Sequence, residues 1–247
     1  MRGFSTLAIV LAFGVALAGC ASSANGRRAV APPSQATSVD ASIIAAALAQ
    51  NSVHWTEFQN LCHVRWTADV TADSGAQRVT IGFCGAKGNV EMRLVDDVVY
   101  VRGNPTGLES ESTIYLTEAQ ARRYAGRWIA IPKGSQLYGV AADGLTLASI
   151  VHDVDARDYN LKIVRTPHAT RVLGFDDGNP PGPSVTLSAQ ASGDPLPVAM
   201  TGTGCVECVY TGGFSKWNEP VHVHAPARST PIATVCGRCS RVWPVHG

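Results

Sequence analysis

The sequence VEMRLVDDVVYV at residues 90–101 carries the clearest strand pattern of the chain. Val90, Met92 and Leu94 alternate with charged residues, and a second apolar run follows at 98–101. An alternation of apolar and polar residues with a period of two is typical of strands that bury one face of a sheet. The stretch therefore predicts two neighbouring strands of an antiparallel sheet with one apolar face.

The same period extends toward the N-terminus as a predicted hairpin. Apolar residues alternate with polar ones over 62–70 and over 79–83, and Asp73-Ser74-Gly75 between these runs is a turn signal. The second half of the chain carries further short runs of the same kind. Beyond the hairpin, strands are expected over 90–94, 98–101, 128–132, 161–164, 171–175, 185–189, 196–200, 209–214 and 221–224.

Three short helices interrupt these strands. Asp40 is a suitable N-cap for a helix that ends near Gln50, and residues 117–120 resemble a capping box. A third helix is expected over 145–154, and 104–113 is expected to be a polar loop. Because strands bracket the helices instead of alternating with them, the pattern predicts a single α+β domain.

The composition excludes several classes of protein. Of the 247 residues, 45% are hydrophobic, which is ample apolar content for a folded core. The formal net charge of +1 gives no clustered basic excess, so no nucleic-acid partner is expected. The sequence has no P-loop, no dinucleotide fingerprint, no metalloprotease motif and no nucleophile elbow. We therefore expect no enzyme, no catalytic residue and no cofactor.

The N-terminus has the features of an export signal. Arg2 precedes an apolar run over 4–18, which is too short for a membrane span of about 20 residues. The run ends in Leu17-Ala18-Gly19-Cys20, which resembles the bacterial lipobox. That resemblance implies a signal peptide over 1–19, cleavage before Cys20 and acylation of Cys20. Residues 20–39 would then be a lipidated cysteine and a flexible tether, because 21–39 are small, polar and proline-containing.

The chain has seven cysteines, so six remain if Cys20 is the anchor. Disulfide bonds are favoured for these six, because a lipobox places the chain in an oxidising compartment. The first two lie on the arms of the predicted hairpin and face each other if a bulge at Gly82 repairs the register. The last four form two CxxC pairs, for which a structural zinc ion is the alternative. The candidates are Cys62, Cys84, Cys205, Cys208, Cys236 and Cys239.

Several of these elements together resemble a known group of proteins. They are the lipobox, the tether, the run 98–101, the segment YAGRWIAIP at 124–132 and the segment FSKWNEPVHVHAP at 214–226. The chain resembles actinobacterial cell-envelope lipoproteins of the LppX/LprG type, which are similar in fold to the LolA and LolB lipoprotein carriers. The resemblance covers roughly 40–226 and leaves 227–247 as a cysteine-containing tail.

The resemblance implies a strongly curved antiparallel sheet, or half-barrel, with short helices across its concave face and an apolar cavity for acyl chains between them. Apolar residues of the strands and of the helix over 145–154 are the candidates to line it, although ordinary core packing accounts for such residues in most proteins. The cavity candidates are Trp66, Ile81, Phe83, Met92, Leu94, Leu147, Ile150 and Val151.

The function implied is that of a lipoprotein anchored on the outer face of the cytoplasmic membrane or in the cell envelope. It would bind or carry an acyl-chain lipid or lipoglycan. The alternative is a structural or protein-interaction lipoprotein with a filled core, whose tail is clamped by disulfides or zinc.

The lipobox assignment predicts that Cys20→Ala abolishes acylation. Metabolic labelling with a fatty-acid analogue should mark the wild-type chain in the membrane fraction and leave Cys20→Ala unlabelled. Cys62→Ala, which removes a cysteine outside the lipobox, is the control and should label normally. Label on Cys20→Ala would disprove the anchor.

Overall fold

A computed structural model of the chain describes residues 35–61, 63–82, 87–110, 114, 116–156, 160–175, 184–205 and 208–236. All of them belong to one compact unit, Pro33–Gly247, and the fold below is that of this unit.

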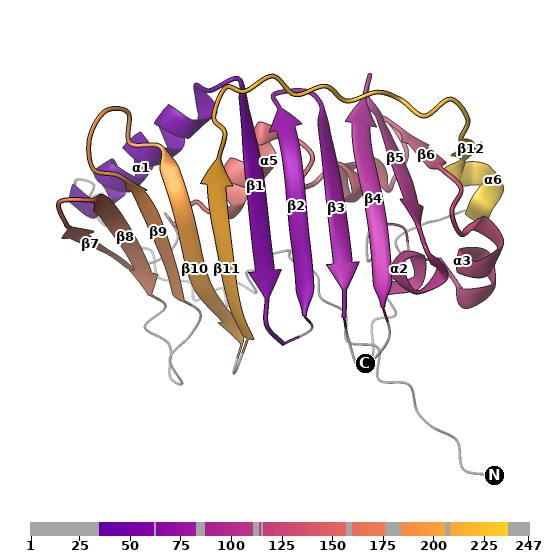
Figure 1. Ribbon diagram of the computed structural model, residues 1–247, viewed down its shortest axis with the longest axis horizontal. Coiled ribbons are helices and arrows are strands. Elements are labelled where there is room, and N and C mark those ends of the chain that lie inside the picture. Colours follow the sequence, from indigo (N-terminus) through magenta and orange to yellow (C-terminus); the bar gives the residue numbers. More distant parts are fainter. Residues whose placement is uncertain are drawn as a thin grey trace, which may run out of the picture. The chain divides into compact units, whose positions relative to one another are not determined.

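Twelve strands form a single open sheet, in the order β12-β6-β5-β4-β3-β2-β1-β11-β10-β9-β8-β7 (Figure 1). Neighbouring strands are antiparallel except β12 and β6, which are parallel. The expected fold class, an α+β half-barrel, is confirmed. The strands are β1 (Ser52–Gln59), β2 (Val64–Thr71), β3 (Gly75–Ile81), β4 (Gly88–Val95), β5 (Val98–Gly103), β6 (Ile129–Pro132), β7 (Asn160–Arg165), β8 (Ala169–Phe175), β9 (Ser184–Gln190), β10 (Pro197–Cys205), β11 (Cys208–Ser215) and β12 (Thr230–Pro231).

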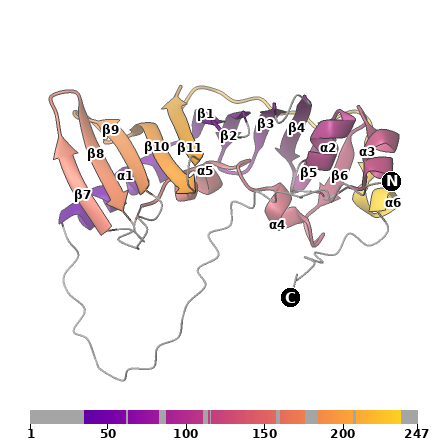
Figure 2. The same ribbon diagram turned by 90° about the horizontal axis from the view of Figure 1, so that it is seen from below.

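The helices lie along one face of this sheet and at its β6 end (Figure 2). The helices α3 and α5 both begin with a capping box, at Thr117 and at Thr146, in which the cap hydroxyl accepts from the backbone N–H three residues on. We call the face covered by α1 and α5 the inner face and the opposite face the outer face. The helices are α1 (Gln35–Leu48), α2 (Pro105–Ser110), α3 (Glu118–Tyr124), α4 (Tyr138–Ala141), α5 (Leu147–Asp153) and α6 (Ile232–Cys236).

The structure differs from the sequence-based expectation at several places. Strand β1 and helix α4 were not expected, the expected loop over 104–113 contains helix α2, and β12 and α6 form in the expected tail. Helix α1 begins at Gln35, so residues 35–39 are helical and not part of a flexible tether, and Asp40 lies inside the helix and is not its N-cap. The expected strand over 221–224 is wrong, because 216–229 has neither helix nor strand. This segment, which we call the strap, crosses the ends of β1 to β5 (Figure 1). A segment that crosses strand ends has no neighbour with which to form a ladder, whatever its own alternation.

Side chains fasten the strap to the sheet. The hydroxyl of Ser52 donates to the Glu219 carbonyl at 2.6 Å, and Arg93 Nη1 donates to the His224 carbonyl at 3.1 Å. Beyond the strap, β12 extends the sheet next to β6, and Gln120 Nε2 donates to the carbonyl of Val235 in α6 at 3.1 Å. The last described segment of the chain is thereby folded onto α3 and β6.

The inner face is covered by two apolar clusters. The first cluster joins β2–β6 to α2, α3, α4 and α6, and the second joins α1 and α5 to β1, β2 and β8–β11. Trp66 is partly buried and packs against both. The largest fully buried members of the first cluster are Leu108, Ile114, Ile129, Ile131, Leu137 and Leu145, and those of the second are Ile43, Val53, Val70, Ile150 and Leu187.

Two helical glycines give a matched test of this packing. A Cβ at Gly107 of α2 would overlap the backbone carbonyl of Asn89 in β4, whereas a Cβ at Gly139 of α4 meets nothing within 4 Å. Gly107→Ala should therefore lower the free energy of unfolding by about 1–3 kcal/mol. Gly139→Ala should leave it unchanged or raise it by up to about 1 kcal/mol. Urea unfolding measures both, and equal effects would contradict the close approach of α2 to β4.

Candidate functional site

The inner face of strand β1 carries polar groups in the middle of the apolar surface. Alternation places Val53, Trp55, Glu57 and Gln59 on this face, and all four are buried. The register sets Glu57 between Trp66 of β2 and Gly212 of β11, at the centre of the sheet. We call Trp55, Glu57 and Gln59 the β1 polar row.

Two members of the row have buried polar atoms without partners. Within the described residues, Trp55 Nε1 and Gln59 Oε1 have no hydrogen-bond partner, although the residues are only 6% and 2% exposed. Buried polar atoms in folded proteins are nearly always paired, and an unpaired one costs about 1–3 kcal/mol. The row therefore offers one unused donor and one unused acceptor to a bound molecule.

Glu57 lies between them on the strand, and the residue is 8% exposed. Burial, and after it the charge of Asp153, raises the pKa of Glu57 to about 7. Among the described residues, no hydrogen bond or ion pair holds this carboxyl. Near neutral pH the group is thus present in both forms, and its protonated form can donate a hydrogen bond.

A second carboxyl approaches the row from helix α5. Asp153 is the last residue of α5, and its side chain reaches solvent. Loss of hydration among the surrounding protein atoms, and after it the charge of Asp143, raises the pKa of Asp153 to about 7. Glu57 is the more deeply buried of the two acids, because Asp153 is exposed. Two acids on facing elements make this part of the inner face sensitive to pH.

Gln77 is a buried polar residue on the same face whose side chain does have a hydrogen-bond partner. It lies on β3, is 5% exposed, and its Nε2 donates to the carbonyl of Gly144 at 3.5 Å. Ala68 of β2 separates it from Trp55 in the register. Its hydrogen bond ties the loop before α5 to the sheet, so Gln77 has a structural role.

The expected cavity residues are divided between the two clusters. Met92 and Leu94 belong to the first cluster with Ile81 packed against it, and Leu147, Ile150 and Val151 belong to the second. Trp66 connects the two groups, and Phe83 lies outside the described residues. All the described candidates except Trp66 and Ile81 are at most 4% exposed, as in a packed core. Their role as cavity lining stays a prediction.

The sequence did not predict the β1 polar row, because its polar residues obscure the alternation by which strand β1 would be recognised. In 52–59 the inward positions are Val53, Trp55, Glu57 and Gln59, so two polar residues interrupt the apolar phase. The remaining signal was weak: aromatic and β-branched residues at 53–58, bounded by Asn51 and Asn60.

Three cysteines of the two CxxC pairs are described, and each is next in sequence to residues outside the described ranges. Cys205 pairs with Cys208 in the register at the end of the β10–β11 hairpin, which fits the tight turn expected of a CxxC pair. Cys208 is buried and Cys236 is partly buried. Cys239 lies outside the described residues. Which cysteines are joined stays a prediction, and so does the zinc alternative.

The expected hairpin cysteines, Cys62 and Cys84, both lie outside the described residues. The β2–β3 ladder nearby pairs Trp66 with Val79. This is one residue away from the register that sets the two cysteines opposite each other. Their disulfide stays a prediction that needs the irregularity expected near Gly82.

Two further features concern metals and membranes. Within the described residues, no group of three or more His, Cys, Asp or Glu side chains is placed to hold a metal ion. No helix in this part of the chain has both the length and the apolar character of a membrane span.

Comparisons with known proteins give likeness to solved structures alone. No family model matches the sequence, and no curated protein matches it. LprF from Mycobacterium bovis has 16% identity and a TM-score of 0.47, over 80% of this chain and 99% of that one. The Mycobacterium tuberculosis lipoprotein LppX has 16% identity and a TM-score of 0.45, over 76% and 98%. An uncharacterised conserved protein from Thermus thermophilus has 11% identity and a TM-score of 0.37, over 79% and 97%. LppX belongs to the group of lipoproteins that the sequence resembles.

Proposed function

We propose that this chain is a membrane-anchored lipoprotein of the cell envelope that binds an acyl-chain lipid or lipoglycan on the inner face of its sheet. The polar end of the ligand contacts the β1 polar row, and its acyl chains lie between the two apolar clusters. The observation that carries the proposal is the unpaired state of Trp55 Nε1 and Gln59 Oε1, within the described residues, in the middle of an apolar face.

The chemistry of the row suits a ligand with hydroxyl or amide groups. Gln59 Oε1 accepts from a hydroxyl, Trp55 Nε1 donates to an oxygen, and the carboxyl of Glu57 does either according to its protonation. Acyl chains then gain about 0.8 kcal/mol for each methylene group removed from water. Binding of this kind makes and breaks no covalent bond, so the proposed role is carriage and not catalysis.

The filled-core alternative also has support. Leu147, Ile150 and Val151 are at most 2% exposed, so α5 is packed tightly against the sheet. For a lipid to bind beneath α5, this helix must move away from β1. A structural lipoprotein needs no such movement, and lipid loading therefore separates the two functions.

The carrier proposal predicts that non-covalent lipid can be extracted from the purified full-length lipoprotein and loaded into it. Organic extraction with mass spectrometry should detect lipid apart from the covalent anchor. Gln59→Leu removes the free acceptor with little change of volume and should weaken loading about fivefold to tenfold, the value of one hydrogen bond. Thr56→Val lies on the outer face of the same strand and is the control.

The outcome that contradicts the carrier role is a protein from which no lipid is extracted and into which none can be loaded. Equal losses in Gln59→Leu and Thr56→Val would also count against the β1 polar row as the binding site.

The raised pKa of Glu57 predicts that stability falls as pH rises. In the folded state the pKa is about 7 against an ordinary value of 4.5, so the native chain holds the extra proton between these values. Stability is then highest below about pH 4.5 for this group and lowest above about pH 7. The full difference is at most about 3 kcal/mol. Glu57→Gln should be more stable than wild type at pH 8 and should depend less on pH.

Urea unfolding at pH 5, 6.5 and 8 measures this effect. Glu109→Gln, at an exposed position of α2, is the control and should follow the wild type. A Glu57→Gln chain with the same pH dependence as wild type would show that the carboxyl is hydrated in the folded state.

A further inference from the structure

A groove of about 660 Å³ lies at the outer face of the sheet, over β3, β4 and β5. Its outward-facing lining is polar: Arg78 and Thr80 of β3, Asn89 and Glu91 of β4, and Arg102 of β5. Val79 and Val90 of the same strands, the segment from Gly103 to Pro105, and the residues Ala125 and Gly126 complete it. Since the β1 polar row is on the inner face, this groove is separate from the site proposed above and does not depend on it.

The charges in the groove are arranged by the strand register. Arg78, Glu91 and Arg102 are directly opposite one another on three neighbouring strands. Arg102 Nη2 lies 2.5 Å from Glu91 Oε2, and Arg93 Nη2 lies 2.6 Å from Glu91 Oε1. Both carboxylate oxygens are therefore used by Arg93 and Arg102. Three arginines surround one carboxylate, which leaves an excess of positive charge.

Arg78 is the one of these three arginines that forms no ion pair with Glu91. It is exposed, and among the described residues it forms no ion pair or hydrogen bond. Its guanidinium group has five N–H donors in a planar fork, which match two oxygens of a phosphate or carboxylate. The groove thus contains the guanidinium group of Arg78, which is free to bind an anion, beside the Glu91 carboxylate, whose charge Arg93 and Arg102 already neutralise.

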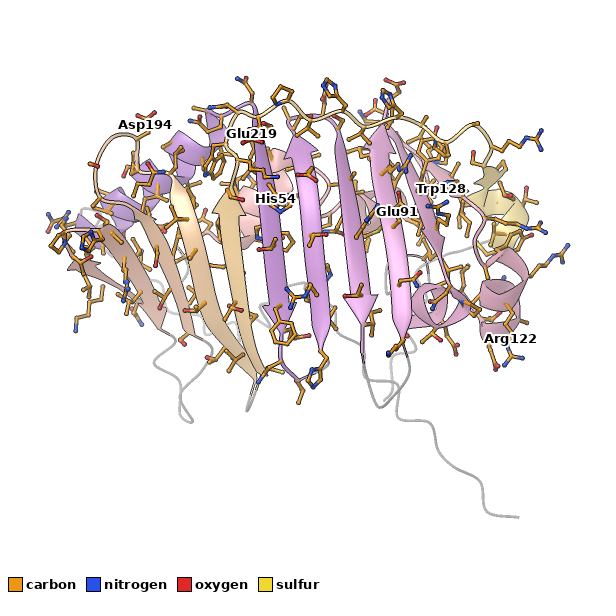
Figure 3. All side chains as sticks on the ribbon, viewed as in Figure 1. His54, Glu91, Arg122, Trp128, Asp194 and Glu219 are labelled. Atoms are coloured by element: carbon orange, nitrogen blue, oxygen red, sulfur yellow. The ribbon has the colours of Figure 1, made fainter. Side chains whose placement is uncertain are left out.

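Neighbouring residues hold the other arginines in place. The guanidinium groups of Arg93 and Arg102 lie 4.7 Å and 4.5 Å from the ring centre of Trp128. Figure 3 shows Glu91 and Trp128 together on the face toward the viewer. Arg93 is also bonded to the strap through the His224 carbonyl. Side chains that are already ordered lose little entropy when a ligand binds.

The remaining lining adds donors and open space. The side-chain oxygen of Asn89 accepts from the backbone N–H of Asn104 at 3.3 Å, which leaves its amide N–H₂ unused among the described residues. The hydroxyl of Thr80 is exposed on the same side of β3. A Cβ placed on Gly126 would meet no atom within 4 Å, so this wall of the groove is open.

We propose that the outer groove binds a phosphate group, held by the fork of Arg78 with Thr80, Asn89 and Arg102 as further donors. The same chemistry would recognise inorganic phosphate and the phosphodiester of a lipid headgroup. A chain anchored at a membrane surface would meet both.

The test is a calorimetric titration of the full-length protein with two soluble probes. Inorganic phosphate represents the free ion, and glycerophosphoglycerol represents a phospholipid headgroup without its acyl chains. Arg78→Gln should weaken binding about tenfold, because it removes a charge-assisted bidentate contact. Arg171→Gln is the control, since Arg171 is exposed on β8, far along the sheet order from β3, and its loss changes the net charge equally.

Binding of either probe that is lost in Arg78→Gln and kept in Arg171→Gln supports the proposal, and the probe that binds identifies the source of the phosphate. The proposal is overturned if neither probe binds, if Arg78→Gln binds as wild type does, or if both variants lose affinity equally. A thermal melt at the wild-type midpoint confirms that Arg78→Gln is folded.

Discussion

The pairing of β1 with β11 is the interaction on which the rest of the structure depends. It joins His54–Gln59 to Tyr210–Ser215, and so connects the strands made early in the chain to those made late. Without this ladder the sheet would separate into the part from β12 to β1 and the part from β11 to β7. The second cluster would then lose its continuity, because it takes Trp55 from one part and Phe214, Met200 and Leu187 from the other. The β1 polar row is therefore located where the two parts of the sheet meet.

Local patterns predicted most of the strands, and the physical reason is direct. Val79, Val90, Met92 and Leu94 show the period of two because one face of their strands is covered by the first cluster. The capping box at Thr117 could be read for a similar reason, since its two hydrogen bonds join residues three apart. These features depend only on near neighbours, and a sequence pattern records near neighbours well.

The rest depends on contacts between distant residues. Strand β1 was missed because Glu57 and Gln59 occupy inward positions that an ordinary sheet fills with apolar side chains. The same two residues make up much of the candidate site, so the polar residues that prevented the prediction of β1 are also the ones of functional interest. The outer groove could not be predicted either, because Arg78, Glu91 and Arg102 meet only through the register of three strands. The strap has a strand-like pattern, but it crosses strand ends and forms no ladder with a neighbouring strand.

The order in which the chain visits the sheet has a consequence for its biogenesis. The first cluster contains Val90 and Val99 from the early strands but also Ile232 and Val235 from α6, beyond the strap. During synthesis, the early strands can form their meander while this part of their apolar surface still lacks its cover. The cluster is complete only when almost the whole chain has emerged, and contacts of such long sequence separation form slowly. Until then the uncovered apolar surface is open to binding by chaperones. The topology thus delays complete folding of this domain until α6 has been made.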